Sequence, residues 1–157
     1  IMKTFKYNFR YGIMNRIIEL ALPQLQKHFQ ISDQNTILIP IPSHVKRIRH
    51  RGFNQSLIIA QGIGKEMDIR VANPLIKTIH TDHQSHKSRA ERLQQKNDIY
   101  SLKPNLSVLL EGKDLVIVDD VCTTGSTLRA TAQRLLNIKP RSITALTLFR
   151  ASRTSGT

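Results

Sequence analysis

Residues 113–136 read KDLVIVDDVCTTGSTLRATAQRLL. Within them the run 115–118 is wholly apolar, which is typical of a strand buried on both faces of a sheet. From Leu128 onward the apolar residues recur at helical spacing, which predicts a helix. Asp119, Asp120 and a short loop of small polar residues lie between the two. The expected order is therefore a buried strand, a pair of carboxylates, a loop and a helix.

The loop has the chemistry of a phosphate-binding site. The first N–H groups of a helix lack partners inside the helix, and the helix dipole places partial positive charge there. Threonine and serine hydroxyls add donors, and a glycine lets the backbone approach a ligand closely. The residues expected to hold a phosphate are Val121, Cys122, Thr123, Thr124, Gly125, Ser126 and Thr127.

The two acids point to a different part of the ligand. Adjacent carboxylates repel each other, and burial would raise their pKa values. Asp119 and Asp120 stay ionised most easily when sugar hydroxyls or a divalent cation face them. The simpler interpretation is that the acids are ordinary loop residues and that Thr127 caps the helix. We favour a ligand in which a phosphate lies beside a ribose, because it satisfies the acids and the loop together.

A further interpretation of the two acids is that they belong to the acidic strand of a P-loop ATPase, and the rest of the sequence excludes it. Such a protein also needs a G-x-x-x-x-G-K-[ST] loop. The nearest match, Gly64-Lys65, is followed by Glu66 and has Ile59 at the position of the first glycine.

A basic loop follows a second expected strand. Residues 36–39 read TILI, and a helix with regularly spaced apolar residues is expected from about Asn54. The segment 46–55 reads KRIRHRGFNQ, with fixed positive charges at Lys46, Arg47, Arg49 and Arg51. In an open α/β sheet both loops lie at the carboxyl ends of strands, where ligands bind. Since guanidinium groups pair well with phosphate oxygens, we expect this loop to hold the pyrophosphate end of the same ligand. A nucleic-acid patch is a compatible alternative.

Residues 116–127 resemble the phosphoribosyl-pyrophosphate (PRPP) signature of type I phosphoribosyltransferases. Residues 49–55 resemble the R-x-R-G-F-N-Q motif of the ComF family of competence and GntX-like proteins. Further matches occur in the same order along nearly the whole chain, at Pro40, Pro42, Thr81, Gln84, Glu91 and Arg92. The resemblance implies a single-domain α/β fold with a mainly parallel twisted sheet and helices on both faces.

For Asp119 and Asp120 the resemblance implies contact with the ribose hydroxyls of PRPP. Mg²⁺ is the implied cofactor, and it is held mainly by PRPP with help from the two acids. The implied reaction is displacement of pyrophosphate by an acceptor whose identity stays open. Members that salvage 6-oxopurines usually have an acid at the position of Thr123, so hypoxanthine and guanine are not expected as efficient acceptors.

The basic loop and the polar segment 80–97 complete the implied site. This segment is longer than most connections, and residues 88–91 (SRAE) predict a short helix within it. The family resemblance implies that segment 80–97 covers PRPP as a hood. Its histidines are interpreted as solvated, because a spacing of three suits neither a helix pair nor a zinc site; they are His80, His83 and His86. The residues implied to face pyrophosphate or to lie near the ligand are Arg49, Arg51, Gly52, Gln84 and Arg92.

Composition narrows the cellular setting and the class of partner. A chain of 157 residues suits one domain, and no apolar run is long enough to span a membrane. One cysteine excludes an internal disulfide and fits a reducing cytoplasm, and no signal peptide is visible. Lys and Arg total 24 against 11 acids, and the net charge of +13 favours polyanionic partners over a merely soluble basic surface.

A nucleic acid is the second expected partner. Residues 3–11 interleave aromatic and basic side chains, as in proteins that bind single strands. A strand or turn that packs these rings on the core is the alternative, and it is slightly favoured. The family's link to natural transformation and DNA uptake adds single-stranded DNA and other competence proteins as partners. It also leaves open a non-catalytic DNA-binding factor with PRPP as a regulator or relic. The expected nucleic-acid contacts are Lys6, Arg10, Lys46 and Arg47.

The domain organisation is expected to be simple. Residues 1–150 should form the phosphoribosyltransferase-like domain, and 151–157 a flexible tail. Family members often carry an N-terminal zinc module with four cysteines. Because this chain has one cysteine and begins with Ile1, we interpret it as a fragment that starts after such a module.

Three further elements are expected from periodicity. Helical spacing over 12–29 predicts a helix that Pro23 kinks or divides. Strands are expected at 74–80 and at 142–149.

Overall fold

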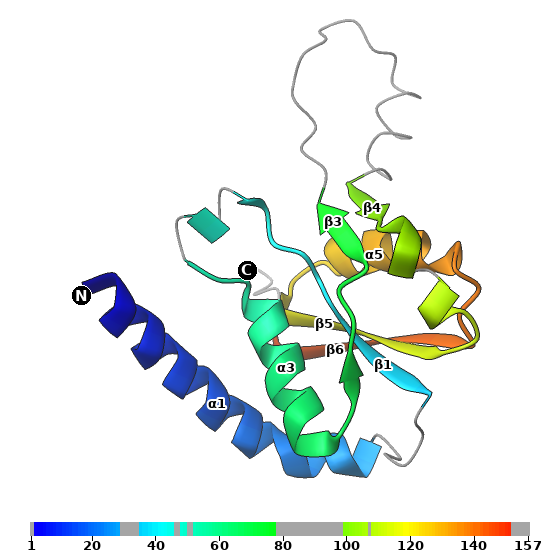
Figure 1. The fold of residues 1–157 in the computed structure, drawn as a ribbon. Helices are drawn as coiled ribbons and strands as arrows, with labels where there is room; N and C mark the ends of the chain where they lie inside the picture. The colour runs from blue at the N-terminus through cyan, green and yellow to red at the C-terminus, as the bar shows by residue number, and fades with distance from the viewer. Residues whose placement is uncertain are drawn as a thin grey trace, which may run out of the picture.

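Four parallel strands form the central sheet of this computed structural model, in the order β2-β1-β5-β6 (Figure 1). The inner strands are β1 (Thr36–Pro40) and β5 (Asp114–Cys122). The outer strands are β2 (Arg70–Val71) and β6 (Ser142–Arg150). The apolar runs of β1 and β5 are buried because each strand has a neighbour on both sides and packed side chains on both faces. The mainly parallel sheet expected from these runs is confirmed.

The helices that pack around this sheet in the described part of the chain are α1 (Met2–His28), α3 (Gln55–Met67) and α5 (Ser126–Leu136). The structure describes residues 2–28, 35–45, 48–49, 52–77, 99–106 and 108–151, with the side chains of α1 described for 12–27. Within that part of the chain, no helix is long and apolar enough to cross a membrane.

Two separate hydrophobic cores cover the two faces of the sheet. One core joins Ile18 of α1 and Ile59 and Ile63 of α3 to the β-strand residues Leu38, Val116, Val118 and Leu146. The other joins Leu135 of α5 to the alternate strand residues Ile37, Ile39, Leu115 and Ile117. Successive side chains of a strand point to opposite faces, so β1 and β5 contribute to both cores. The expected helices on both faces are confirmed (Figure 1).

Helix α1 differs from the expectation. The sequence favours a strand or turn for residues 3–11, but one helix runs from Met2 to His28, and Pro23 does not divide it. A proline removes one backbone hydrogen bond, whereas packing of the helix against α3 through Ile18 holds the turns on its N-terminal side. Extending an existing helix costs little, which explains why the segment before Gly12 continues it.

A small antiparallel pair, β3 (Leu75–Lys77) with β4 (Tyr100–Leu102), lies beside α5 and adds Leu75 and Tyr100 to its core. Two short 3₁₀ helices follow, Pro104–Leu106 and Val108–Leu110. The strand expected at 74–80 is present at 75–77, and the one at 142–149 is present as β6. The short strands β2 and β4 were not predicted. Residues 78–98 lie outside the described part, and with them the expected hood, the helix at 88–91 and the three histidines.

Candidate functional site

The acid pair lies at the carboxyl end of β5, next to the end of β1. Pro40, the last residue of β1, pairs with Val118, and the N–H of Ile41 donates to the Val118 carbonyl at 3.0 Å. Asp119 and Asp120 come directly after this point. The chain that enters the basic loop therefore leaves the sheet beside the two carboxylates, as expected for loops at the same edge of a parallel sheet.

Asp119 is the more constrained of the two acids. Its Oδ1 accepts a hydrogen bond from the Ser56 hydroxyl at 2.9 Å and another from the Asp120 N–H at 3.0 Å. Burial raises the pKa of Asp119 above its ordinary value, and these two hydrogen bonds oppose the rise. Oδ1 of Asp120 accepts a bond from the N–H of Val121 at 2.9 Å. A ligand that donates to Asp119 would favour its charged form.

The strand continues past the acids, so Val121 and Cys122, which were expected in the loop, belong to β5 and pair with Phe149 and Arg150 of β6. Only residues 123–125 join β5 to α5.

Gly125 occupies the N-cap position with φ 72° and no side-chain cap, so the interpretation of Thr127 as the cap is wrong. A side chain in that left-handed conformation is strained, and a Cβ there would lie 3.2 Å from Nη1 of Arg129. The glycine thus gives the backbone its turn and leaves the first N–H groups of α5 without a side-chain acceptor from the N-cap.

The polar groups of the loop are exposed and ordered around Thr124. The Thr124 hydroxyl donates to the Ser126 hydroxyl at 3.0 Å, and the Arg129 guanidinium donates to the Thr124 carbonyl at 2.9 Å. The side chains of Thr123, Thr124, Ser126 and Thr127 are exposed. The Ser126 N–H also donates to the Thr124 hydroxyl, at 3.4 Å. Hydroxyls, backbone N–H groups at the start of a helix and a nearby cation together form a surface suited to a phosphate.

The basic loop is closed at its base by Asn54. Oδ1 of Asn54 accepts from the Ser43 hydroxyl at 2.9 Å, and Nδ2 donates to the Ile41 carbonyl at 3.0 Å. The loop turns at Gly52, which has φ 90° and donates its N–H to the Ile48 carbonyl at 2.7 Å. These bonds hold the two ends of the loop together at the carboxyl edge of the sheet.

The structure brings only some of the predicted site residues together. Asp119, Asp120 and residues 121–127 form one continuous strand end and loop, and Ile41 connects that strand end to the basic loop. Arg49, which is exposed, and Gly52 lie in the basic loop between β1 and α3. The predicted residues outside the described part of the chain are Lys46, Arg47, Arg51, Gln84 and Arg92. Lys6 and Arg10 belong to α1, where only the backbone is described at those positions.

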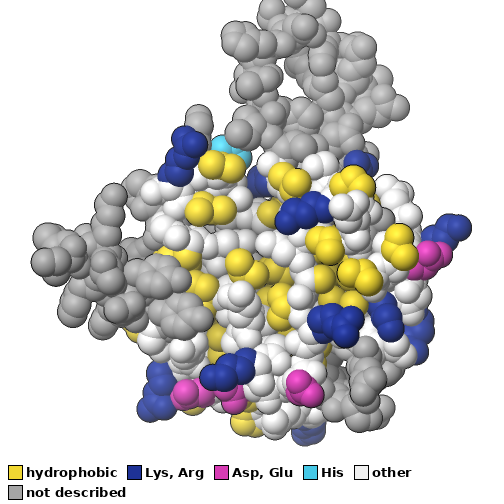
Figure 2. All heavy atoms as spheres, in the orientation of Figure 1, with side chains coloured by type: hydrophobic (Ala, Val, Ile, Leu, Met, Phe, Trp, Pro, Cys, Tyr) yellow, Lys and Arg dark blue, Asp and Glu magenta, His cyan; other side chains and the backbone are white. Residues whose placement is uncertain are grey.

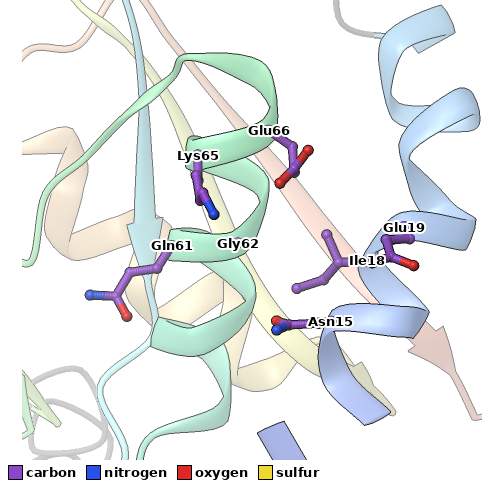
Figure 3. A pocket seen from close by; sticks show the side chains of 7 residues that line it. All are labelled: Asn15, Ile18, Glu19, Gln61, Gly62, Lys65 and Glu66. Carbon is purple, nitrogen blue, oxygen red and sulfur yellow. The ribbon is translucent and has the colours of Figure 1, made fainter. Parts of the chain in front are cut away.

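A cavity of about 520 Å³ lies elsewhere, between α1 and α3 (Figure 3). Its lining residues are Asn15, Ile18, Glu19, Gln61, Gly62, Lys65 and Glu66, and none of them is a predicted site residue. Among the described residues, no group of three or more His, Cys, Asp or Glu side chains is placed to hold a metal ion.

Ser56 contacts the acid pair and Arg129 contacts the loop, although neither is among the residues predicted for the site. The sequence does indicate that Ser56 is buried, because it falls at helical spacing with Ala60, Ile63 and Met67 on the buried side of α3. A serine on an apolar helix face needs a hydrogen-bond partner. No local pattern indicates Arg129, since its contact depends on how the loop turns at Gly125.

The family model described as "Phosphoribosyl transferase domain" matches residues 54–156. The chain is 34% identical over 120 residues to Competence protein ComFC of Bacillus subtilis, covering 76% of this chain and 46% of that protein. It is 28% identical over 155 residues to Competence protein F of Haemophilus influenzae, covering 96% of this chain and 67% of that protein. The chain therefore spans about half of ComFC and two thirds of Competence protein F.

The fold resembles that of adenine phosphoribosyltransferase from Saccharomyces cerevisiae. The TM-score is 0.56 over 89% of this chain and 69% of the yeast chain, and the identity of 11% limits the likeness to the fold. The domain match, by contrast, covers more than half of the chain and includes both the acid pair and the loop. The chain therefore belongs to the phosphoribosyl transferase domain family and, within it, to the ComF group of type I phosphoribosyltransferases.

Proposed function

We propose that the chain binds PRPP together with Mg²⁺ as a phosphoribosyltransferase-type domain formed by residues 1–150. The observation that carries the proposal is the carboxylate pair near the carboxyl end of β5, with a three-residue loop (123–125) and the start of α5 two residues further on. Carboxylates suit ribose hydroxyls, and the loop suits a phosphate. Both features come from one strand–loop–helix unit, so a single ligand with both groups would contact them together.

The proposed roles follow from these positions. Asp119 and Asp120 hold the ribose hydroxyls, and the groups of residues 121–127 hold the 5′-phosphate. Asp119 and Asp120 would help PRPP to hold Mg²⁺, which would supply positive charge beside the leaving pyrophosphate. The basic loop adds guanidinium groups that stabilise the negative charge of the same pyrophosphate. These groups are those of Arg49 and Arg51. The other proposed PRPP-binding residues are Gly52 in the basic loop and Gln84 and Arg92 in the hood.

The proposed chemistry is transfer of the phosphoribosyl group to an acceptor. The bond between the anomeric carbon and the pyrophosphate oxygen breaks through an oxocarbenium-like state, and the acceptor forms the new bond at that carbon. The Asp119 carboxylate orients the sugar for this displacement, since a ligand held at several points reacts with less loss of entropy.

The first test is a calorimetric titration of Mg²⁺–PRPP into the wild-type protein. We expect saturable binding at one site per chain that weakens when Mg²⁺ is removed with a chelator. Pyrophosphate release across a panel of nitrogen-containing acceptors then tests turnover. Absence of PRPP binding by the folded protein would contradict the proposed function.

A second candidate function is binding of single-stranded DNA in DNA uptake, with PRPP as a regulator or relic and other competence proteins as partners. The relatives named competence proteins and the net charge of +13 support it. Basic side chains occur around much of the face in Figure 2, and acids occupy few places on it. The proposed contacts are Lys6 and Arg10, which belong to α1, together with Lys46 and Arg47.

Turnover distinguishes the two candidates. A protein that releases pyrophosphate with an acceptor is a transferase, whereas one that binds PRPP and DNA without turnover is a binding factor. The single cysteine fits a reducing compartment, and we propose a cytoplasmic location for either function.

A further inference from the structure

Ser56 lies where helix α3 meets the acid pair. The residue is polar and stands in the first turn of the helix, yet it is only 4% exposed. Its hydroxyl donates a hydrogen bond of 2.9 Å to Oδ1 of Asp119, which is 63 residues away along the chain. A buried hydroxyl without a partner is costly, so this bond fixes the two side chains relative to each other.

The Asp119 carboxylate is held through one oxygen. The N–H of Asp120 donates to Oδ1 at 3.0 Å, and the Ser56 hydroxyl donates to the same atom. Among the residues that the structure describes, both bonds given to this carboxylate therefore end on Oδ1. Oδ2 keeps its capacity to accept hydrogen bonds from a ligand.

The same turn of α3 also holds the basic loop. Asn54 bonds the Ser43 hydroxyl and the Ile41 carbonyl, at 2.9 and 3.0 Å. The Ile41 N–H in turn donates to the residue that precedes Asp119. Asn54 and Ser56 are two residues apart, so one rigid element fastens both the pyrophosphate side and the ribose side of the site.

We propose that Ser56 is a positioning residue of the PRPP site, whose hydroxyl holds Oδ1 of Asp119 so that Oδ2 is presented to the ribose hydroxyls. This inference rests on the proposed function. Alanine at this position removes the Ser56 bond and leaves, from the described part of the chain, the backbone bond of Asp120, so the carboxylate gains rotational freedom. Ordering it again during binding weakens the affinity, because pre-organisation is lost.

The test is a double-mutant cycle on Mg²⁺–PRPP affinity, measured by calorimetry. The proteins are the wild type, Ser56→Ala, Asp119→Asn and the double variant. We expect Ser56→Ala to weaken binding about tenfold when Asp119 is present and less than about twofold in the Asp119→Asn background, because the two residues act as a pair.

Ser142→Ala is the matched control. The Ser142 hydroxyl donates to Oδ1 of Asp114 at 2.6 Å, which is the same kind of bond at the opposite end of β5. Its loss should leave PRPP affinity unchanged. If Ser56→Ala fails to fold, Ser56→Cys replaces it, since cysteine keeps the size of the side chain but is a weak donor; the same loss is expected.

Wild-type affinity in a folded Ser56 variant, or an equal loss in both backgrounds, overturns the inference and leaves the proposed function intact. A wild-type protein that binds no PRPP overturns the proposed function and this inference with it.

Discussion

At the scale of single residues, the two neighbouring acids are held differently. Asp119 is bonded by Ser56 from another element, and burial raises its pKa, whereas Asp120 accepts a bond from the adjacent N–H of Val121. A buried carboxylate with a raised pKa gains from further donors. The geometry therefore favours Asp119 as the acid that depends most on ligand hydroxyls.

Replacing both acids tests their role directly. We expect Asp119→Asn with Asp120→Asn to weaken PRPP binding tenfold or more, because hydrogen bonds to charged groups are worth roughly 1.5–3 kcal/mol each. Asp114→Asn is the control, since it removes a carboxylate from the other end of the same strand. Calorimetry gives the affinities, and unchanged affinity in a folded double variant would disprove the assignment.

Thr123 determines which acceptors are expected to react poorly. It is exposed in the loop, and no acid occurs between Val121 and Lys139. A threonine hydroxyl does not titrate near neutral pH and is a poor general acid or base. We therefore expect little or no turnover with hypoxanthine or guanine at saturating Mg²⁺–PRPP. Steady-state rates near the usual enzyme range of about 1–10³ s⁻¹ would show that another group supplies the proton.

At the scale of secondary-structure elements, the sequence predicts features that depend on consecutive residues, and it does not predict contacts between residues far apart in the chain. The strand–acids–loop–helix unit was predictable because apolar run, acids and helical period are consecutive in residues 113–136. The bond between Ser56 and Asp119 spans 63 residues, so no window of sequence contains it. The aromatic residues in 3–11 alternate in the manner of a strand, and the helix that follows overrode that pattern. Strands as short as Arg70–Val71 have no periodicity to detect.

The contacts of Asp114 at the amino end of β5 predict how the stability of the fold depends on pH. Arg141, which precedes β6, and Ser142, its first residue, both donate to Asp114. The Arg141 hydrogen bond is the main cause that lowers the pKa of Asp114 to about 2 from 3.8. A lowered folded-state pKa adds stability above pH 3.8 that is lost as the pH falls toward 2.

We expect wild type to exceed Asp114→Asn in stability by about 1 kcal/mol or less at neutral pH, because Arg141 is half exposed and such pairs are weak. The difference should shrink between pH 4 and pH 2. Thermal unfolding of both proteins across that range measures it, and a difference that stays constant would rule out this carboxylate as its source.

At the scale of the whole molecule, the excess of positive charge is larger than one PRPP site needs. The net charge is +13, and helix α1 extends beyond its packing on α3 (Figure 1). A single strand of DNA can neutralise such a surface without sequence-specific contacts, since cations pair with its phosphates and aromatic rings stack on its bases. We therefore expect weak binding of an oligothymidylate with little sequence preference.

Salt dependence tests whether this binding is electrostatic. If about four phosphates are contacted, log K should fall against log salt with a slope near −3. Lys6→Ala with Arg10→Ala should reduce the slope by about 0.7 for each contact removed. Arg16→Ala on the same helix is the control, because Arg16 is paired with Glu19 at 2.7 Å. Fluorescence anisotropy over a salt series supplies the slopes; binding that is absent at low salt, or that does not respond to salt, would exclude DNA as a partner of this surface.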